Sequence, residues 1–372
     1  MWRSPAREPP PPQVVEIILD EETDEPRIPE DVDAFFMMGL PGVFKKPNSM
    51  LSQEERDRKQ EVGRTVLLPR VKSGGWVHVP SAGLNHVFKI FEGTTIMAGK
   101  GALADAEGPR GIRLTHNPGV QGLPMAEYVV AHVLSIAKRI PQHIEMQRAH
   151  VWEKVMQRSP SRDTIGILGC GGIGMYTAKL LRAFGIRVLA TKRSVKQHLL
   201  TASAGADVGE ANGLGEGEMS LVDEWFPADD ESMLEVFKRS TYVVCCLPLT
   251  PTTGQCITTR HFEALGAESY FINVSRGDVI DQDALIAALE SETIAGAVLD
   301  VTTPEPLPKG HPLWTTKNCY ITAHDSWKTL ESEDRNYDFF VDNARRFIAE
   351  DDMVAEVVDL HRSISFNKLE IK

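Results

Sequence analysis

Short apolar runs alternate with helical segments through the second half of the chain. The run Thr164–Leu168 leads directly into glycines, and a helical stretch separates it from Ile186–Ala190, so this part of the chain predicts a βαβ unit. Further strands and one helix are expected at Tyr242–Leu247, Tyr270–Val274, Ala295–Leu299 and Cys319–Thr322, and at Asp283–Glu290. Strands and helices that alternate in this way favour a parallel, doubly wound sheet.

The first part of the chain has the pattern of a smaller α/β module. Residues 1–12 are proline-rich and predict a disordered tail, and Val14–Leu19 is the first expected strand. The apolar runs that follow alternate with Gly and Pro turns and lie at Val66–Leu68, Trp76–Val79, Thr95–Ala98 and Ile112–Thr115.

The two halves are joined by a segment with helical periodicity. Apolar residues recur at helical spacing from Pro124 for about four turns, and helical character resumes over His143–Val155. Later, residues 202–219 are rich in Gly, Ala and Glu without periodicity, which predicts a surface loop.

Length and composition narrow the class of protein. A chain of 372 residues predicts two domains, at about 100 to 200 residues each. Its 42% hydrophobic and 25% charged residues are typical of soluble globular proteins, and a net charge of -12 argues against a nucleic-acid partner. Five cysteines without CxxC spacing indicate neither a disulfide framework nor a metal site. Without a signal peptide or membrane span in the pattern, we expect a cytoplasmic protein with no membrane partner.

The glycines after the first strand of the βαβ unit match GxGxxG. Gly169 permits a tight turn, Gly171 lets backbone N–H groups approach a pyrophosphate, and Gly174 lets the following helix pack against the strand. Gly172 and Ile173 complete the motif. The alternative is a Gly-rich turn selected for conformation alone, but the flanking βαβ pattern favours dinucleotide binding.

The end of the next strand indicates which dinucleotide is preferred. Sites that prefer NAD carry an Asp or Glu about 20 residues after the glycines, and none stands here. The strand instead ends in two cations, Lys192 and Arg193, and two hydroxyls, Thr191 and Ser194, which could hold a 2′-phosphate. We therefore expect NADP as the preferred cofactor, with NAD possible. The alternative is that Lys192 and Arg193 form an ordinary solvated strand end.

Three later segments make the prediction more specific: Ile272–Asp281, Leu299–Leu307 and Ile321–His324. Together with GxGxxG, their NVxRG, LDV, EP and late His motifs resemble the D-isomer-specific 2-hydroxyacid dehydrogenases. The resemblance runs from about Trp76 to Trp327 and is closest from Asp163 onward. The stretch LDVTTPEPLPKGHPLW resembles the glyoxylate/hydroxypyruvate reductases in particular.

Residue chemistry agrees with that resemblance. Reduction of a 2-oxo acid needs a fixed cation for the carboxylate and a proton donor for the ketone oxygen, which becomes negative as hydride arrives. Arg276 suits the first task and His324 the second, while the Glu305 carboxylate would favour the protonated imidazole and orient it. Singly, each has a plainer explanation as a surface cation, a loop acid or a core histidine. Jointly, and with the cofactor motif, they favour catalysis.

The resemblance implies further binding residues. Asp300 would contact the nicotinamide amide, and Leu247 and Pro248 would line the adenosine side. Ser81, Ala82 and Gly83 would offer backbone N–H groups to the substrate carboxylate. Asp300 has an alternative role as a strand-end cap, and the Ser-Ala-Gly segment has one as a simple turn.

The architecture implied by the resemblance is a Rossmann dinucleotide domain, residues 117–323, and a flavodoxin-like α/β substrate domain, residues 13–116 and 324–372. Hinges would lie near Asn117 and Ala323, and closure would exclude water. The resemblance and the long apolar helix also predict a homodimer. Trp152 matches a family Trp near the subunit interface, although a lone Trp is more often a core residue.

One departure from the family pattern falls at the expected pocket. After His324 the family has a small apolar run with Gly, whereas this chain has Asp325, Ser326 and Trp327. Trp327 would either shrink the space or stack on a larger 2-oxo acid, and Asp325 would tune His324 or face solvent. The alternative function is a dinucleotide-sensing binding protein of the corepressor type. The retained Arg, Glu and His argue against it.

Overall fold

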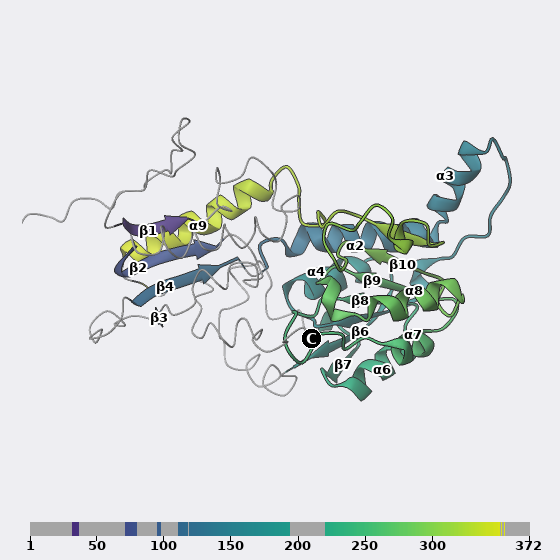
Figure 1. Cartoon of the computed structure of the whole chain (residues 1–372), viewed down its shortest axis with the longest axis horizontal. Coiled ribbons are helices and arrows are strands. Elements are labelled where there is room, and N and C mark those ends of the chain that lie inside the picture. Colours follow the sequence, from purple (N-terminus) through teal and green to yellow (C-terminus); the bar gives the residue numbers. More distant parts are fainter. Residues whose placement is uncertain are drawn as a thin grey trace, which may run out of the picture. The chain divides into compact units, whose positions relative to one another are not determined.

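The structure is a computed structural model that describes residues 32–36, 71–79, 95–97, 111–117, 119–193, 220–349, 351 and 353. The chain divides into two compact units (Figure 1). Within the described residues, those up to Asn117 and those from Asp334 onward form one unit, and those from Gly119 to Glu333 form the other. Within the described parts, no helix combines the length and the apolar character needed to cross a membrane.

The first unit is a parallel sheet with a helix packed against it. Its described strands are β1 (Val32–Phe36), β2 (Val71–Val79), β3 (Thr95–Met97) and β4 (Gly111–His116), in the order β1-β2-β4-β3. Trp76 on β2 is fully buried, and its ring stacks on Phe340 of α9 (Ser332–Ile348) with centroids 5.2 Å apart. The helix therefore closes the core of this unit, although it lies far from the sheet in sequence.

The sequence predicted β2, β3 and β4 but not β1. The expected strands Val14–Leu19 and Val66–Leu68 lie outside the described residues, as does the expected loop 202–219.

The described residues of the second unit form a seven-stranded parallel sheet in the order β11-β10-β9-β8-β5-β6-β7. Its strands are β5 (Thr164–Leu168), β6 (Arg187–Lys192), β7 (Glu224–Pro227), β8 (Tyr242–Cys245), β9 (Tyr270–Asn273), β10 (Gly296–Leu299) and β11 (Cys319–Ile321). The chain starts at β5, winds outward to β7, and returns to β8 on the other side of β5. This order confirms the predicted doubly wound Rossmann sheet, and its switch point lies between β5 and β8.

Helices cover both faces of this sheet. On β8, Tyr242 and Val244 belong to one core and Val243 and Cys245 to the other, because successive side chains of a strand point to opposite faces. The first core includes α2 (Gly122–Ala137) and α4 (Gly172–Arg182). The second includes α6 (Asp230–Lys238), α7 (Thr259–Leu265) and α8 (Gln282–Glu290). Burial on both faces explains the continuous apolar runs.

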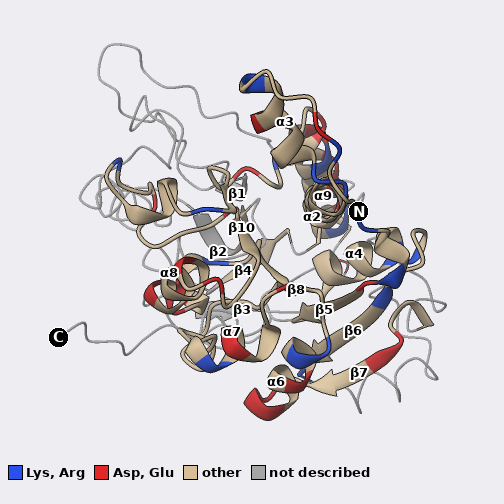
Figure 2. Ribbon diagram, turned by 90° about the vertical axis from the view of Figure 1, so that its right-hand side faces the viewer, with Lys and Arg blue, Asp and Glu red and all other residues tan. Residues whose placement is uncertain are grey.

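Short 3₁₀ helices complete the second unit: η5 (Pro160–Arg162), η8 (Gly277–Val279) and η9 (Pro312–Trp314). Charged side chains are not evenly spread over it. Basic residues lie on β6, whereas acidic residues lie on β7 and at the start of α6 (Figure 2).

The elements β7, α6 and α7 were not predicted. The sequence does carry a signal for α6, because Asp229 caps the helix by accepting from Ser232 N and is followed by Asp230 and Glu231 in the first turn. No comparable signal marks β7, a short edge strand of sequence EWFP.

The helix α3 (Ile140–Arg148) projects from the body of the second unit (Figure 1). The predicted helical stretch reached Val155, but the helix ends at Arg148, and His150 takes the left-handed conformation with φ 56°. Trp152 is 100% exposed, so the core role that a lone Trp usually has does not apply within this chain.

The division between the units differs from the predicted boundary at residue 324. His324 belongs to the second unit, and the chain passes to the first at Asp334. The reason is that Asp300 accepts hydrogen bonds from the backbone of Asp325 and Ser326, while Ser326 and Ser332 are buried. The assignment of substrate and cofactor roles to the two units stays a prediction.

Candidate active site

In the Gly-rich turn after β5, neighbouring atoms leave no room for a side chain at the first and last glycine, whereas the middle glycine faces open space. Gly169 has φ +79°, and a Cβ placed there would lie 3.1 Å from the Cα of Leu247. A Cβ on Gly174 would lie 2.9 Å from the Ile167 side chain, so only Gly lets α4 pack so closely on β5. A Cβ on Gly171 would meet nothing within 4 Å. The turn therefore has the shape expected of a pyrophosphate cradle.

The start of α4 supplies the hydrogen-bond donors of this cradle. The N-cap residue, Gly171, offers no side-chain cap, so the first N–H groups of the helix stay available to an anion. Thr191, fully buried at the end of β6, fixes the turn from behind: its hydroxyl accepts from Gly169 N at 3.0 Å and its carbonyl from Cys170 N at 2.9 Å. The Thr191 hydroxyl was a predicted ligand of a 2′-phosphate, but the structure places it fully buried and bonded to Gly169 N. These residues fit a dinucleotide.

The proposed 2′-phosphate end of the site contains Lys192 and Arg193; Ser194 lies outside the described residues. The Lys192 ammonium lies 5.8 Å from the ring centroid of Trp225, within the range of a cation–π contact. Burial lowers the pKa of Lys192, and Cys170 opposes this shift. Arg193 is exposed. Trp225 was not predicted, because β7 was missed.

Leu247 and Pro248 follow β8 after one residue and therefore lie on the other side of the switch point from the glycines. Leu247 is buried against Gly169, and the Pro248 carbonyl accepts from the Thr253 hydroxyl at 2.6 Å. Their placement is compatible with the predicted contact to adenosine, which stays a prediction.

Each of the predicted catalytic residues lies in the segment that follows one of the strands β9, β10 and β11. Arg276 follows β9, Glu305 follows β10 and His324 follows β11. Because the strands are parallel neighbours, their carboxyl ends lie at one edge of the sheet. The fold thereby brings three segments distant in sequence to the same edge as the Gly-rich turn.

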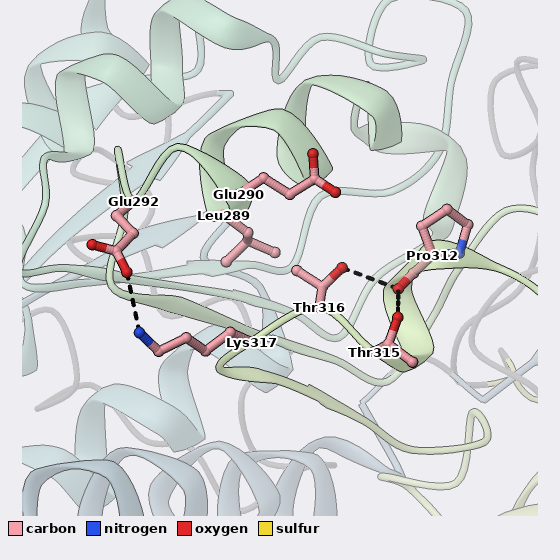
Figure 3. A pocket seen from close by; sticks show the side chains of 7 residues that line it. All are labelled: Leu289, Glu290, Glu292, Pro312, Thr315, Thr316 and Lys317. Atoms are coloured by element: carbon pink, nitrogen blue, oxygen red, sulfur yellow. Dashed lines mark hydrogen bonds and ion pairs between the residues drawn. The ribbon is translucent and has the colours of Figure 1, made fainter.

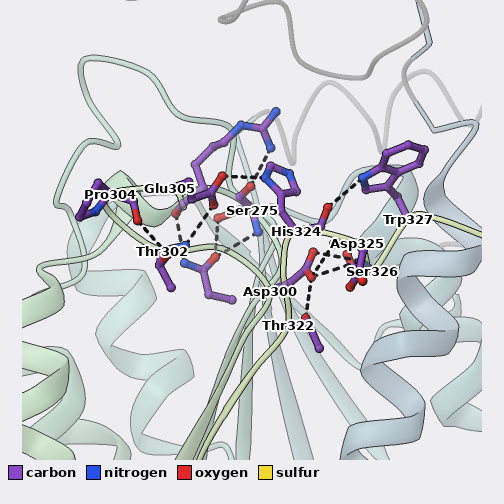
Figure 4. Close-up of polar contacts among 12 residues, drawn as sticks. Ser275, Asp300, Thr302, Pro304, Glu305, Thr322, His324, Asp325, Ser326 and Trp327 are labelled. Carbon is purple, nitrogen blue, oxygen red and sulfur yellow. Dashed lines mark hydrogen bonds and ion pairs between the residues drawn. The ribbon is translucent and has the colours of Figure 1, made fainter. Parts of the chain in front are cut away.

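His324 and Glu305 form a direct contact at this edge (Figure 4). The imidazole Nδ1 lies 2.9 Å from Glu305 Oε2, and both side chains are about one-third exposed, at 36% and 32%. A carboxylate only accepts, so Nδ1 carries the proton and Nε2 is left for another partner. Glu305 Oε1 accepts from Thr302 N at 3.1 Å.

The electrostatics of Glu305 favour the carboxylate. Burial raises its pKa, but the hydrogen bond and charge of His324, the Thr302 N–H and the charge of Arg276 lower it more, and the net pKa lies below the usual 4.5. Glu305 is therefore ionised at neutral pH.

Arg276 stands on a turn organised by Asn273. The Asn273 side chain accepts from Ser275 N at 3.0 Å and donates to the Arg276 carbonyl at 3.1 Å. The guanidinium donates to the Ser275 carbonyl at 2.7 Å. Burial lowers the pKa of the guanidinium and the charge of Glu305 opposes this shift, so Arg276 remains a cation at neutral pH.

Asp300, at the end of β10, binds the segment that carries His324 (Figure 4). Its carboxylate is 1% exposed and accepts from the Thr322 hydroxyl at 2.6 Å, from Asp325 N at 3.0 Å and from Ser326 N at 3.2 Å. Its carbonyl accepts from His324 N at 2.9 Å. These hydrogen bonds are the ones expected if Asp300 caps the end of a strand, which was the alternative to a role in cofactor binding. The contact with nicotinamide stays a prediction.

A hydrogen-bonded side chain from α2 extends this network. Thr322 donates to Asp300, so the Tyr128 hydroxyl, 2.8 Å from the Thr322 oxygen, donates to Thr322 in turn. Burial raises the pKa of Tyr128, which keeps its proton. Tyr128 was not predicted, since it stands on a helix whose apolar spacing indicated packing alone.

The residues after His324 that differ from the family pattern lie within the described part of the chain. The Trp327 indole donates to the His324 carbonyl at 3.1 Å, which holds the ring beside the segment that carries His324 (Figure 4). Asp325 is exposed. The predicted carboxylate-binding residues Ser81, Ala82 and Gly83 lie outside the described residues.

A surface hollow of about 250 Å³ lies elsewhere in the second unit, at the end of α8 (Figure 3). Its residues are Leu289, Glu290, Glu292, Pro312, Thr315, Thr316 and Lys317. Two of them, Lys317 and Glu292, form an ion pair at 3.1 Å, and none of the predicted site residues line the hollow. It has no part in the site at the sheet edge.

The fold and the Gly-rich turn define the second unit as a Rossmann-type dinucleotide-binding domain. The family model for the NAD-binding domain of D-isomer specific 2-hydroxyacid dehydrogenases matches residues 130–213 and 221–326, about half of the chain. The protein belongs to the D-isomer specific 2-hydroxyacid dehydrogenase family, as the sequence motifs predicted.

Comparisons with individual proteins agree. The chain is 35% identical over 221 residues to glyoxylate reductase/hydroxypyruvate reductase of Mus musculus and to that of Homo sapiens. The match covers 58% of this chain and 60% of each relative. A crystal structure of a D-isomer specific 2-hydroxyacid dehydrogenase from Xanthobacter autotrophicus Py2, in complex with NADPH and MES, superposes with a TM-score of 0.64 at 26% identity. That likeness covers 93% of this chain and 90% of the other.

Proposed function

We propose that the protein is an NADPH-preferring reductase that transfers a hydride to a 2-oxo acid and gives a D-2-hydroxy acid. The observation that carries this proposal is the 2.9 Å contact between His324 Nδ1 and Glu305 Oε2 at the sheet edge that also holds Arg276. This combination supplies a fixed cation, a proton donor and a carboxylate that orients the donor.

The proposed mechanism assigns one task to each side chain. Arg276 binds the substrate carboxylate and the ketone oxygen with its planar fork and so orients the carbonyl carbon. The nicotinamide, when bound, supplies the hydride. His324 gives the proton on Nε2 to the ketone oxygen as negative charge develops there. Glu305 keeps its negative charge and stabilises the imidazolium until the proton leaves.

The preference for NADPH rests on charge at the end of β6. Lys192 and Arg193 stand where an NAD-preferring site carries an acid, and the Lys192 ammonium is steadied over Trp225. A 2′-phosphate would gain charge-assisted hydrogen bonds from both side chains. The Xanthobacter relative binds NADPH, which supports the same preference.

The substrate class is proposed from relatives and from the site together. The mouse and human relatives are named for glyoxylate and hydroxypyruvate, so these small 2-oxo acids are the first candidates. Trp327, held beside His324, offers an apolar surface that a bulkier 2-oxo acid would contact. We further propose a cytoplasmic homodimer in which the exposed Trp152 lies at the subunit contact.

The test is NADPH oxidation, followed by absorbance, with glyoxylate, hydroxypyruvate and bulkier 2-oxo acids, run in parallel with NADH. His324→Asn should lower kcat by roughly 10²- to 10⁴-fold, as expected for loss of a general acid. His150→Asn is a matched control, because both histidines have φ 56° and Asn tolerates that conformation. No turnover with any 2-oxo acid, together with tight dinucleotide binding, would instead favour the corepressor-type alternative.

A further inference from the structure

The segment that carries Glu305, residues 300–306 and here called the Glu305 loop, has no regular secondary structure beyond the end of β10 (Figure 4). Pro304 and Pro306 have no N–H groups, so few backbone donors are left to fix its conformation. Thr302 N is committed to Glu305 itself. The conformation of the loop must therefore be set by contacts from other segments.

One such contact comes from Gln282, the first residue of α8. Its side-chain Nε2 donates to the Thr303 carbonyl at 2.5 Å, and its Oε1 accepts from Thr303 N at 2.9 Å. The amide thus pairs with both backbone groups of a single residue. Among side chains only Asn and Gln carry a donor and an acceptor in this planar arrangement, and Asn is shorter by one methylene.

Residues shortly before Gln282 in the chain contact the Glu305 loop at two further points. The Thr303 hydroxyl donates to Asp278 at 2.9 Å, and a Cβ on Gly277 would lie only 2.2 Å from the Thr302 carbonyl oxygen. The backbone after Arg276 therefore packs directly against the backbone before Glu305. Residues 276–282 include Arg276, the proposed substrate-binding cation, and also contact the loop that carries Glu305.

We propose that Gln282 is a positioning residue, whose amide holds the Thr303 peptide and thereby keeps Glu305 against His324. The inference rests on the proposed function for its catalytic meaning. Gln282 acts through Glu305, since its side chain contacts Thr303 and, at 3.4 Å, His311, but no described group of the proposed substrate site. Removing the amide should loosen the loop and misplace the carboxylate without disturbing the Gly-rich turn.

The test compares Gln282→Met, similar in length but without the amide, with Asp281→Ala. Asp281 is the N-cap of the same helix, accepting from Ala284 N at 3.0 Å, and its loss weakens α8 without removing a bond to the loop. Hydrogen exchange measured on peptides covering residues 300–306 should be faster in Gln282→Met and unchanged in Asp281→Ala. This measurement does not depend on turnover.

Kinetic measurements then show whether Gln282 acts through Glu305. In Gln282→Met, kcat for the 2-oxo acid should fall roughly 10- to 100-fold, as for a modest misplacement of a catalytic group, with an unchanged KM for NADPH. In a Glu305→Gln background the same change should lower kcat less than about twofold, because coupled residues are not additive. Asp281→Ala should leave kcat unchanged.

Two results would overturn the inference: equal exchange of the loop in wild type and Gln282→Met, or a full additional loss of kcat in the Glu305→Gln background. A wild-type protein that reduces no 2-oxo acid would refute the proposed function alone. In that case the exchange of the loop still decides whether Gln282 holds it.

Discussion

Replacing Asp300 by Asn changes the charge of a carboxylate that holds the His324 segment while leaving its size nearly unchanged. The carboxylate is 1% exposed, and its Oδ1 accepts from Thr322, Asp325 N and Ser326 N. Among the described residues, Oδ2 accepts only from Ser326 N, at 3.2 Å. An Asn side chain would therefore place its oxygen at the Oδ1 position. Its NH₂ group would then face Ser326 N, which is also a donor.

The size of the effect follows from the bonds at Oδ1. Hydrogen bonds to a charged group contribute about 1.5 to 3 kcal/mol, against about 0.5 to 1.5 for neutral pairs, so each of the three bonds weakens by about 1 kcal/mol. Relief from burying a charge offsets part of this loss. We expect Asp300→Asn to lower the free energy of unfolding by about 2 kcal/mol, which corresponds to a Tm lower by about 4 to 8 °C.

Urea unfolding and a thermal scan measure this change, and Asp325→Asn is the matched control. Asp325 lies in the same segment with an exposed side chain, so its substitution should change stability by less than about 0.5 kcal/mol. If both variants lost the same stability, or if Asp300→Asn lost less than about 0.5 kcal/mol, the reasoning from the buried carboxylate would be refuted.

Three other outcomes are expected. Gly277→Ala should lower both Tm and NADPH oxidation, because its Cβ would lie 2.2 Å from the Thr302 carbonyl oxygen; unchanged values would contradict this steric argument. Burial raises the pKa of Glu305 but His324 lowers it more, so the pKa is lower in the folded state than in the unfolded state. The ionised carboxylate therefore stabilises the fold above pH 4.5, and this contribution is lost as the pH falls through the folded-state pKa. The difference in urea stability between wild type and Glu305→Gln should therefore shrink below pH 4.5, and a constant difference would count against it. Trp152→Ser should weaken the proposed dimer about tenfold or more in sedimentation experiments, whereas an unaltered dimer would exclude Trp152 from the contact.

Much of the second unit could be predicted from the sequence because its strands are buried on both faces. A strand of this kind is a short continuous apolar run, and β5 was predicted with the bounds observed, Thr164–Leu168. The Gly-rich turn was equally clear, since its conformation and close packing require Gly at defined positions. The family followed from short motifs at the strand ends.

Other elements could not be predicted for physical reasons. The edge strand β7 contains Glu and Pro and is only partly buried, so its sequence resembles a loop. The helical periodicity beyond Arg148 was interrupted by the left-handed backbone at His150, a conformation that the sequence did not indicate. The boundary at Asp334 depends on bonds between Asp300 and residues that follow His324.

The sequence by itself therefore determined the parallel sheet, the cofactor turn, the family, and the identity of Arg276, Glu305 and His324 as candidates. Only the tertiary structure decided which side chains hold them. The contacts that Asp300 makes with Asp325 and Gln282 with Thr303 join residues 25 and 21 positions apart, without any spacing that marks them in the chain. Hydrogen bonds form between groups that the sheet places at one edge, and that edge exists only once parallel strands have paired.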